Sequence, residues 1–288
     1  MTDERTKGSI FAILGAISFG GMAFLVRTIS GQIPLNELVF VRGLTGLLFF
    51  FPAVFVHDLR NIFSIKAKSL WLRSLAAGTS VTLYYYNIQV CGAANATAIH
   101  NTSPMIVMLL AWLIYKDRLR PIDYVAVIVV FTGSFALSSP SGANLPTSAI
   151  IVGFTGALTA AISFTALKKV ARSFSSGQVV WAFSLLMIVV SLTVPGEGWV
   201  WNIGFINIVC VLGIALLGLL GQILMTKSYI YLSPSIASSL SLTSLVWSGL
   251  GEALLLGFIP NVMTIVSYGI IISGVVLLNM KYRRAAAI

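Results

Sequence analysis

Residues 93–119 read AANATAIHNTSPMIVMLLAWLIYKDRL, an apolar run of membrane-spanning length that contains four consecutive polar residues, 100–103, followed by a proline. Pro104 has no N–H, so the carbonyl of His100, four residues earlier, loses its helical hydrogen bond. An unpaired backbone group costs about 2–7 kcal/mol in hydrocarbon, and it is tolerated only against another helix or an aqueous cavity. The stretch therefore predicts a broken membrane helix that faces the protein interior.

The composition of the whole chain extends this interpretation. Of its 288 residues, 58% are hydrophobic and only 9% are charged, and the mean hydropathy is +0.97. A soluble domain with so few charges could not keep a wettable surface. The net charge of +10 comes from basic residues scattered singly between apolar runs, which indicates membrane topology rather than nucleic-acid binding. The chain is predicted to be an all-α integral membrane protein.

Apolar runs long enough to cross about 30 Å of hydrocarbon at about 1.5 Å per helical residue predict the transmembrane helices. Ten such runs are found, at residues 8–28, 36–56, 69–89, 93–115, 121–138, 147–167, 177–194, 204–226, 233–256 and 261–280. With both termini in the cytoplasm, 16 of the 18 basic residues lie on or near the inner face, all except Arg27 and Arg42. This charge pattern predicts cytoplasmic termini and an even number of spans.

The chain also resembles itself at an offset of 141 residues without any gap. The small-residue stripe Ala12, Ala16, Gly20 recurs as Gly153, Ala157, Ala161, and the other matches are Arg27 with Lys168, Thr102-Ser103 with Thr243-Ser244, and Gly133 with Gly274. Residues 1–141 and 142–288 are therefore predicted to be two five-helix repeats. Because five is odd, the second repeat enters the membrane from the opposite side, which gives an inverted repeat typical of transporters.

The polar residues at the predicted break are candidates for binding a solute. We expect His100, Asn101 and Ser103 to line a central cavity, with Pro104 as a conformational hinge. Two alternatives stay open: a proline kink that merely packs against neighbouring helices, and a role for His100 in carrying a coupling proton.

The second repeat and the third span supply further candidates. Ser244 lies on the serine-rich face of the ninth span, where small hydroxyl residues also serve helix packing. Trp247 lies in mid-span, away from the interfaces where tryptophan is common, so it is a candidate stacking platform. Of the three consecutive tyrosines 84–86, at most two can face one cavity, and we choose Tyr84.

The distribution of charge inside the spans narrows the function. Arg42 lies within a span away from the inner face, where it either snorkels outward or binds a carboxylate. No Asp or Glu lies near the centre of a span, which disfavours a proton-coupled carrier of lipophilic cations and favours cargo that is neutral overall. No catalytic constellation and no metal- or cofactor-binding motif is found, so the chain is not expected to be an enzyme.

The stretch LGAISFGGMAFLVR at 14–27, the stretch at 93–119 and the two five-span halves resemble the EamA-type branch of the drug/metabolite transporter superfamily, in particular YddG-like exporters. The chain differs from the family pattern at Asp117, where glutamate is common, and at Leu245, where the second half lacks the proline; Gly251-Glu252 resembles a family Gly-Glu pair.

The resemblance implies a secondary transporter of the bacterial inner membrane that exports aromatic and other neutral amino acids by alternating access. A multidrug or nucleotide-sugar carrier on the same fold is the alternative. The expected partners are a small-molecule substrate and membrane lipid, not nucleic acid, and the protein is expected to work as a monomer or a dimer.

Overall fold

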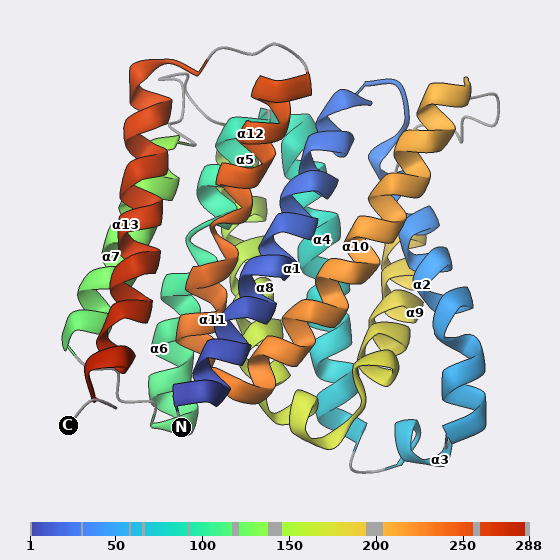
Figure 1. Ribbon diagram of the computed structural model, residues 1–288. Coiled ribbons are helices and arrows are strands. Elements are labelled where there is room, and N and C mark those ends of the chain that lie inside the picture. The colour runs from blue at the N-terminus through green and yellow to red at the C-terminus, as the bar shows by residue number, and fades with distance from the viewer. Residues whose placement is uncertain are drawn as a thin grey trace.

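The computed structural model describes residues 2–29, 31–57, 59–64, 67–91, 93–116, 121–137, 146–193, 204–255 and 260–285 (Figure 1). Thirteen helices lie within these residues: α1 Thr2–Thr28, α2 Leu35–His57, α3 Leu59–Ile62, α4 Lys68–Cys91, α5 Ala93–His100, α6 Ser103–Tyr115, α7 Pro121–Leu137, α8 Thr147–Ser173, α9 Ser176–Thr193, α10 Phe205–Tyr231, α11 Pro234–Ser241, α12 Ser244–Leu255 and α13 Val262–Ala285. The short α3 lies between spans, and α5 with α6 and α11 with α12 each form one interrupted span. The ten spans expected from hydropathy are confirmed.

Helices α8 and α10 continue past their predicted ends. The apolar runs end at 167 and 226, whereas α8 continues to Ser173 and α10 to Tyr231. The added turn of α8 is amphipathic: Val170 is fully buried, while Lys169 and Arg172 are exposed. Hydropathy detects only the segment inside hydrocarbon, so it misses a turn that emerges from the membrane and still packs on one side.

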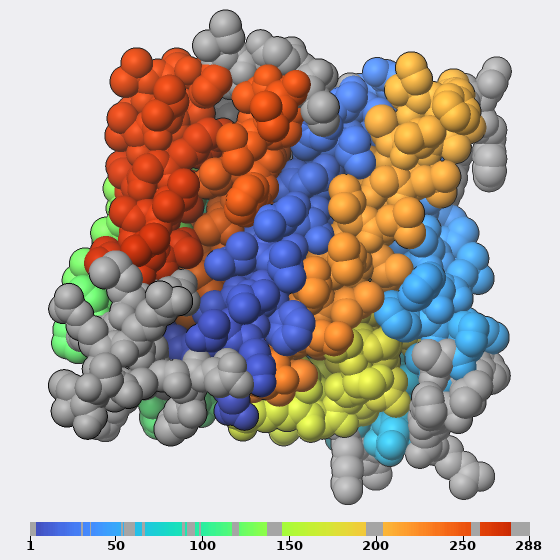
Figure 2. All heavy atoms as spheres, in the orientation of Figure 1, coloured from blue at the N-terminus to red at the C-terminus, as the bar shows by residue number. Residues whose placement is uncertain are grey.

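The outer surface of the bundle is apolar. Four helical segments of the described chain are long and apolar enough to cross a membrane without interruption: Glu4–Thr28, Thr147–Ser173, Ser176–Thr193 and Phe205–Tyr231. Along α10, large side chains at helical spacing are exposed, namely Phe205, Val209, Leu212, Leu216 and Leu220. The space-filling view shows α13, α12, α1 and α10 side by side across one face (Figure 2). Such an exterior is stable in contact with lipid chains rather than water.

The contacts between helices recur at the 141-residue offset. In the first half α1 packs against α10, α11 and α12, and in the second half α8 packs against α4, α5 and α6, which are the equivalent helices. The equivalent pairs α2 with α9 and α7 with α13 pack against each other. Each half therefore supplies one copy of the same set of interfaces, and the core forms between the halves.

The two halves run in opposite directions. Figure 1 shows α1 starting from the end of the molecule that carries both chain termini, whereas α8 runs towards that end. The predicted boundary between residues 141 and 142 lies outside the described residues. The small-residue stripes face the interior as expected, since Ala16, Ala157 and Ala161 are at most 1% exposed. A Cβ on Gly153 would come within 2.6 Å of Asn87 Nδ2, so the contact of α8 with α4 depends on a small residue there.

The crossing of α7 and α13 depends on the glycine pair that the repeat predicted. A Cβ on Gly274 would lie 2.9 Å from the backbone N of Val130 and 3.0 Å from the carbonyl O of Ala126. We expect Gly274→Ala to lower the free energy of unfolding by about 1–3 kcal/mol, because backbone atoms cannot move aside as a side chain can. Thermal unfolding in detergent measures this effect. Gly269→Ala on the same helix is the matched control, because nothing lies within 4 Å of its Cβ position, and equal melting temperatures for the two variants would contradict the prediction.

Candidate functional site

The first broken helix is interrupted at the polar residues singled out from the sequence. Helix α5 ends at His100 and α6 begins at Ser103. At the break, the carbonyl of Ile99 accepts hydrogen bonds from the backbone N–H of Thr102 at 3.1 Å and from its side-chain Oγ1 at 2.7 Å. Pro104 is in the first turn of α6, where a missing N–H costs no intrahelical bond.

The second broken helix repeats this arrangement 141 residues later. Helix α11 ends at Ser241, α12 begins at Ser244, and the Leu240 carbonyl accepts from Thr243 N–H at 3.2 Å and from Thr243 Oγ1 at 2.8 Å. Leu245 stands where the first half has Pro104, so the break does not require a proline. Pro104 was expected to cause the interruption. The threonine turn, in which a hydroxyl and an amide donate to one carbonyl and tighten the backbone, was not foreseen from the sequence. The hinge role of Pro104 stays a prediction.

A test of this turn compares two threonines with the same kind of hydrogen bond. In Thr243→Val the carbonyl of Leu240 loses a buried donor, and we expect the free energy of unfolding to fall by about 1 kcal/mol. Thr155 Oγ1 donates to Ile151 O at 2.8 Å on an exposed, uninterrupted part of α8, so Thr155→Val should change stability little. Thermal unfolding measures the loss of stability in both variants. A larger loss in Thr155→Val than in Thr243→Val would refute the role of the turn.

The predicted site residues of the first half lie together. The Tyr84 hydroxyl and Thr97 Oγ1 are hydrogen-bonded at 2.8 Å, and the rings of Tyr84 and His100 lie 4.7 Å apart between centroids. The His100 Nδ1 atom is buried and has no hydrogen-bond partner among the described residues. Asn101 and Ser103 follow at the break and are 7% and 4% exposed.

The predicted residues of the second half lie against α1. A Cβ on Gly20 would come within 2.6 Å of Ser244 O and 2.7 Å of Trp247 Cβ, so these two residues pack directly on that helix. Trp247 is 36% exposed, which places it at a surface rather than in the core. Within the described chain no hydrogen bond or ring contact joins Ser244 or Trp247 to Tyr84 or His100. Helix α6 packs on α11, so the two broken helices are neighbours although these two groups of side chains are separate.

Two buried arginines form a cluster that the sequence argument found only in part. Arg42 of α2 and Arg73 of α4 are 8% and 1% exposed, and their guanidinium carbons lie 6.0 Å and 5.2 Å from the centroid of the Phe183 ring on α9. Arg73 Nη2 donates to Gln222 Oε1 on α10 at 3.1 Å. Arg73 was expected near the inner face, as a topology signal. It lies one turn inside α4 and turns into the bundle, which its position in an apolar run could have suggested.

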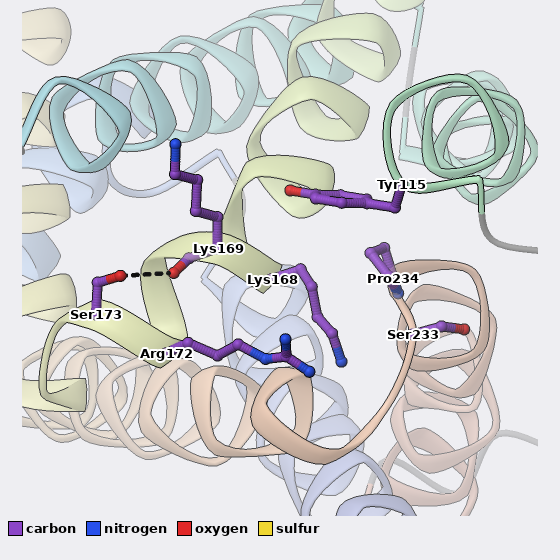
Figure 3. A pocket seen from close by; sticks show the side chains of 7 residues that line it. All are labelled: Tyr115, Lys168, Lys169, Arg172, Ser173, Ser233 and Pro234. Carbon is purple, nitrogen blue, oxygen red and sulfur yellow. Dashed lines mark hydrogen bonds between the residues drawn. The ribbon is translucent and has the colours of Figure 1, made fainter.

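A basic pocket of about 440 Å³ opens where α6 and α8 end and α11 begins (Figure 3). It is lined by Tyr115, Lys168, Lys169, Arg172, Ser173, Ser233 and Pro234. The Tyr115 hydroxyl donates to Thr165 O at 2.9 Å, and Lys168 Nζ donates to the carbonyl of Leu232. Three cations around one hollow attract anions. The pocket is at the end of the molecule that holds the chain termini, where the basic residues were predicted to gather.

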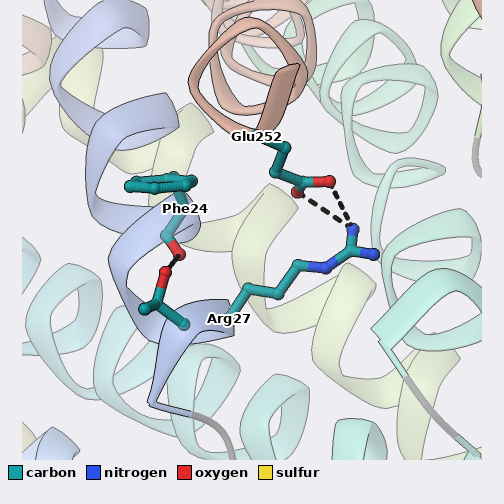
Figure 4. Close-up of polar contacts among 4 residues, drawn as sticks. Phe24, Arg27 and Glu252 are labelled. Atoms are coloured by element: carbon teal, nitrogen blue, oxygen red, sulfur yellow. Dashed lines mark hydrogen bonds and ion pairs between the residues drawn. The ribbon is translucent and has the colours of Figure 1, made fainter. Parts of the chain in front are cut away.

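An ion pair joins α1 to α12 (Figure 4), near the end of α1 that lies away from the chain termini (Figure 1). Arg27 Nη1 lies 2.9 Å from each carboxylate oxygen of Glu252, and the Glu252 side chain is nearly buried while that of Arg27 is exposed. Beside this pair Phe24 packs under Gly251, and Thr28 Oγ1 donates to the Phe24 carbonyl at 3.0 Å. The sequence placed Arg27 and Glu252 at outer helix ends without pairing them. Asp117, the other acidic position that the resemblance singled out, lies outside the described residues.

No group of three or more His, Cys, Asp or Glu side chains that could hold a metal ion occurs among the described residues. The buried polar groups of the described residues include hydroxyls, amides, guanidinium groups, the His100 imidazole and the carboxylates of Glu37, Asp123 and Glu252. Such groups bind small solutes through hydrogen bonds and charge.

Comparisons with known proteins agree with this geometry. The profile of the EamA-like transporter family matches residues 6–139 and again residues 147–280. An uncharacterized transporter of Helicobacter pylori is 25% identical over 263 residues, which cover 87% of this chain and 86% of that protein. The pseudopaline exporter CntI of Pseudomonas aeruginosa is 22% identical over 264 residues, covering 91% and 92%. Human solute carrier family 35 member G1 is 24% identical over 240 residues, covering 77% and 64%.

The fold also matches a solved structure. A chain of known crystal structure superposes with a TM-score of 0.82 at 17% sequence identity, over 97% of this chain and 99% of the other. At this identity the likeness concerns the fold alone.

Proposed function

The chain belongs to the EamA-like transporter family, and from that premise we propose that it is a secondary transporter that exports small metabolites across a bacterial inner membrane. Family membership indicates transport of a small molecule rather than catalysis. The observation that carries the proposal is the pair of broken helices, at 101–102 and 242–243, each contributed by one half and packed against the other. Interrupted helices of inverted repeats are the usual place of solute sites in such carriers.

Alternating access is the mechanism that we propose. Arg27 and Lys168 are equivalent positions at opposite ends of the molecule, and each binds a segment outside its own helix. Arg27 pairs with Glu252 on α12, and Lys168 donates a hydrogen bond to the carbonyl of Leu232. In the proposed cycle the Arg27–Glu252 contact, which joins the two halves, opens while the halves exchange conformations around a central site, whereas the Lys168–Leu232 contact lies within the second half. In this proposal both termini are cytoplasmic, and the basic pocket is the inner entrance.

The class of cargo is proposed from three sources. The amino-acid exporters that the sequence resembles suggest neutral amino acids, and the relative in Pseudomonas aeruginosa is named an exporter of a metabolite, pseudopaline. The aromatic contact of Tyr84 with His100 offers an apolar surface next to the buried amide of Asn101. The basic pocket favours, as a second candidate, a carrier of anionic metabolites such as nucleotide sugars.

Transport by the purified protein in proteoliposomes tests the proposal. Liposomes loaded with an unlabelled solute should accumulate the same labelled solute by exchange, for a panel of aromatic, neutral and acidic amino acids and nucleotide sugars. Accumulation of a neutral amino acid above that in protein-free liposomes supports the first cargo class. If none of the amino acids moves, the amino-acid assignment is wrong, and if no solute in the panel moves, the proposed transport activity itself is in conflict with the data.

A further inference from the structure

Arg73 is a buried cation that forms no ion pair with any of the described residues. The residue is 1% exposed, and its one hydrogen bond among the described residues goes to the neutral amide oxygen of Gln222. Its Nε and Nη1 atoms are buried and have no hydrogen-bond partner in the part of the chain that the structure describes. A guanidinium group has five N–H donors, so most of the binding capacity of Arg73 is unused.

Arg42 places a second cation at the same aromatic ring. Its guanidinium group contacts Phe183 and also lies against Gly218, where a Cβ would come within 2.6 Å of Arg42 Nε. Two buried carboxylates of the described residues, those of Asp123 and Glu252, pair with Arg5 and Arg27 instead. The two buried arginines therefore concentrate positive charge between α2, α4, α9 and α10.

The energetics of burial explain why this arrangement points to a ligand. Removing a charge from water is costly, and an amide oxygen or an aromatic face repays only part of that cost. Natural proteins keep uncompensated buried charges mainly where these charges serve binding or catalysis. On α10, Gly218 and Gln222 are one turn apart and Tyr229 follows two turns later, and among the described residues its buried hydroxyl has no partner. One face of this helix therefore carries the approach of Arg42 at Gly218, the hydrogen bond of Arg73 to Gln222 and the Tyr229 hydroxyl, and it runs towards the end that carries the basic pocket.

We propose that Arg42 and Arg73 bind a carboxylate group of the transported solute, with the ring of Phe183 holding both guanidinium groups in place. The inference rests on the proposed transport function and specifies the cargo: a metabolite with a free carboxylate, such as an amino acid or an organic acid. Guanidinium groups form strong charge-assisted hydrogen bonds to carboxylates, and the charge supplied by the cargo completes the site. The cations of the basic pocket attract the same group at the entrance.

The test compares each carboxylate with its amide, because the two compounds have nearly the same shape and differ in charge. Thermal stabilisation of the purified protein is measured with benzoate against benzamide, L-phenylalanine against L-phenylalaninamide, and succinate against succinamide, at matched ionic strength. We expect at least one carboxylate to raise the melting temperature and its amide not to do so. If no carboxylate stabilises the protein more than its amide, the proposal is wrong.

Substitutions locate the effect. In Arg73→Met and in Arg42→Met, the carboxylate concentration that gives half of the maximal stabilisation should rise by at least about tenfold. Arg73→Lys should retain part of the carboxylate effect. Lys227→Met, which removes an exposed cation of α10 outside both the arginine pair and the basic pocket, is the control and should leave the carboxylate effect unchanged. Without ligand, Arg73→Met should melt at a higher temperature than the wild type, because it removes an uncompensated buried charge; a purely structural Arg73 would give the opposite sign.

The outcomes separate this inference from the proposed transport activity. Exchange of a labelled solute that lacks a carboxylate, unchanged in Arg73→Met, would overturn the inference and leave transport intact. Absence of exchange for every solute would overturn transport, while carboxylate-specific stabilisation that is lost in Arg73→Met would still support the site. If Arg73→Met does not fold, Arg42→Met provides the same comparison.

Discussion

Valine in place of Gly20 is expected to reduce transport to the level of protein-free liposomes. The Cβ of any larger residue would lie 2.6 Å from Ser244 O and 3.0 Å from Ser248 N, which are backbone atoms of α12. These atoms cannot give way without moving the helix that begins at the second break. Overpacking of this kind costs about 3 kcal/mol, and here it would fall on the contact between α1 and α12. Solute exchange and the melting temperature of the variant measure the two effects.

The adjacent glycine provides the control for this prediction. A Cβ on Gly21 would meet only Leu217 Cδ1, at 3.2 Å, and that methyl group can turn away. Gly21→Val should therefore fold and transport nearly as the wild type does. If Gly21→Val is impaired as strongly as Gly20→Val, the effect comes from β-branching in α1 rather than from the contact with α12.

Covalent linkage of α1 to α12 at the site of the Arg27–Glu252 ion pair is expected to stop transport reversibly. The pair lies at the end of the molecule away from the chain termini, and under alternating access this crossing must open once in each cycle. In a background without the native cysteines 91 and 210, Arg27→Cys with Glu252→Cys can be joined by a bifunctional thiol reagent that carries a disulfide. Exchange should fall to the background level on cross-linking and return on reduction.

Single-cysteine variants serve as the matched control for the cross-link. Arg27→Cys alone and Glu252→Cys alone lose the ion pair and take up the reagent, but they cannot join the two helices. Each should keep most of its transport, because an ion pair with an exposed partner contributes only about 0–1 kcal/mol. Full transport in the cross-linked double variant would show that α1 and α12 do not separate during the cycle.

Sequence reasoning located the spans because their signal is local. Hydrophobic length, charge at helix ends and the recurrence of Gly133 as Gly274 can each be read without knowledge of packing. The first break was placed correctly, between His100 and Ser103, because Pro104 marks it. The second break has no proline, and its only sign was the recurrence of Thr102-Ser103 as Thr243-Ser244.

The features that sequence reasoning missed depend on long-range geometry. Arg27 and Glu252 are 225 positions apart, so nothing in the chain pairs them before it folds. Arg73 lies five residues after Lys68, near the start of α4, where a basic residue usually faces water. The orientation of α4 about its own axis instead directs Arg73 towards Gln222. Trp247 was expected to be a stacking platform in mid-span, and the structure places its Cβ against Gly20 of α1. Which side chains share a cavity is decided by packing between helices, which hydropathy does not encode.

We propose that the two broken helices border an aqueous path, and the reactivity of thiols placed on them towards a water-soluble reagent measures this. In the cysteine-free background, Ser103→Cys and Ser244→Cys are treated with a small membrane-impermeant methanethiosulfonate, with Leu216→Cys on the exposed apolar face of α10 as the lipid-facing control. We expect the thiols at 103 and 244 to react during solute exchange, a transported solute to slow their reaction, and the thiol at 216 to stay unlabelled. Labelling at 216 with none at 103 or 244 would contradict the proposal.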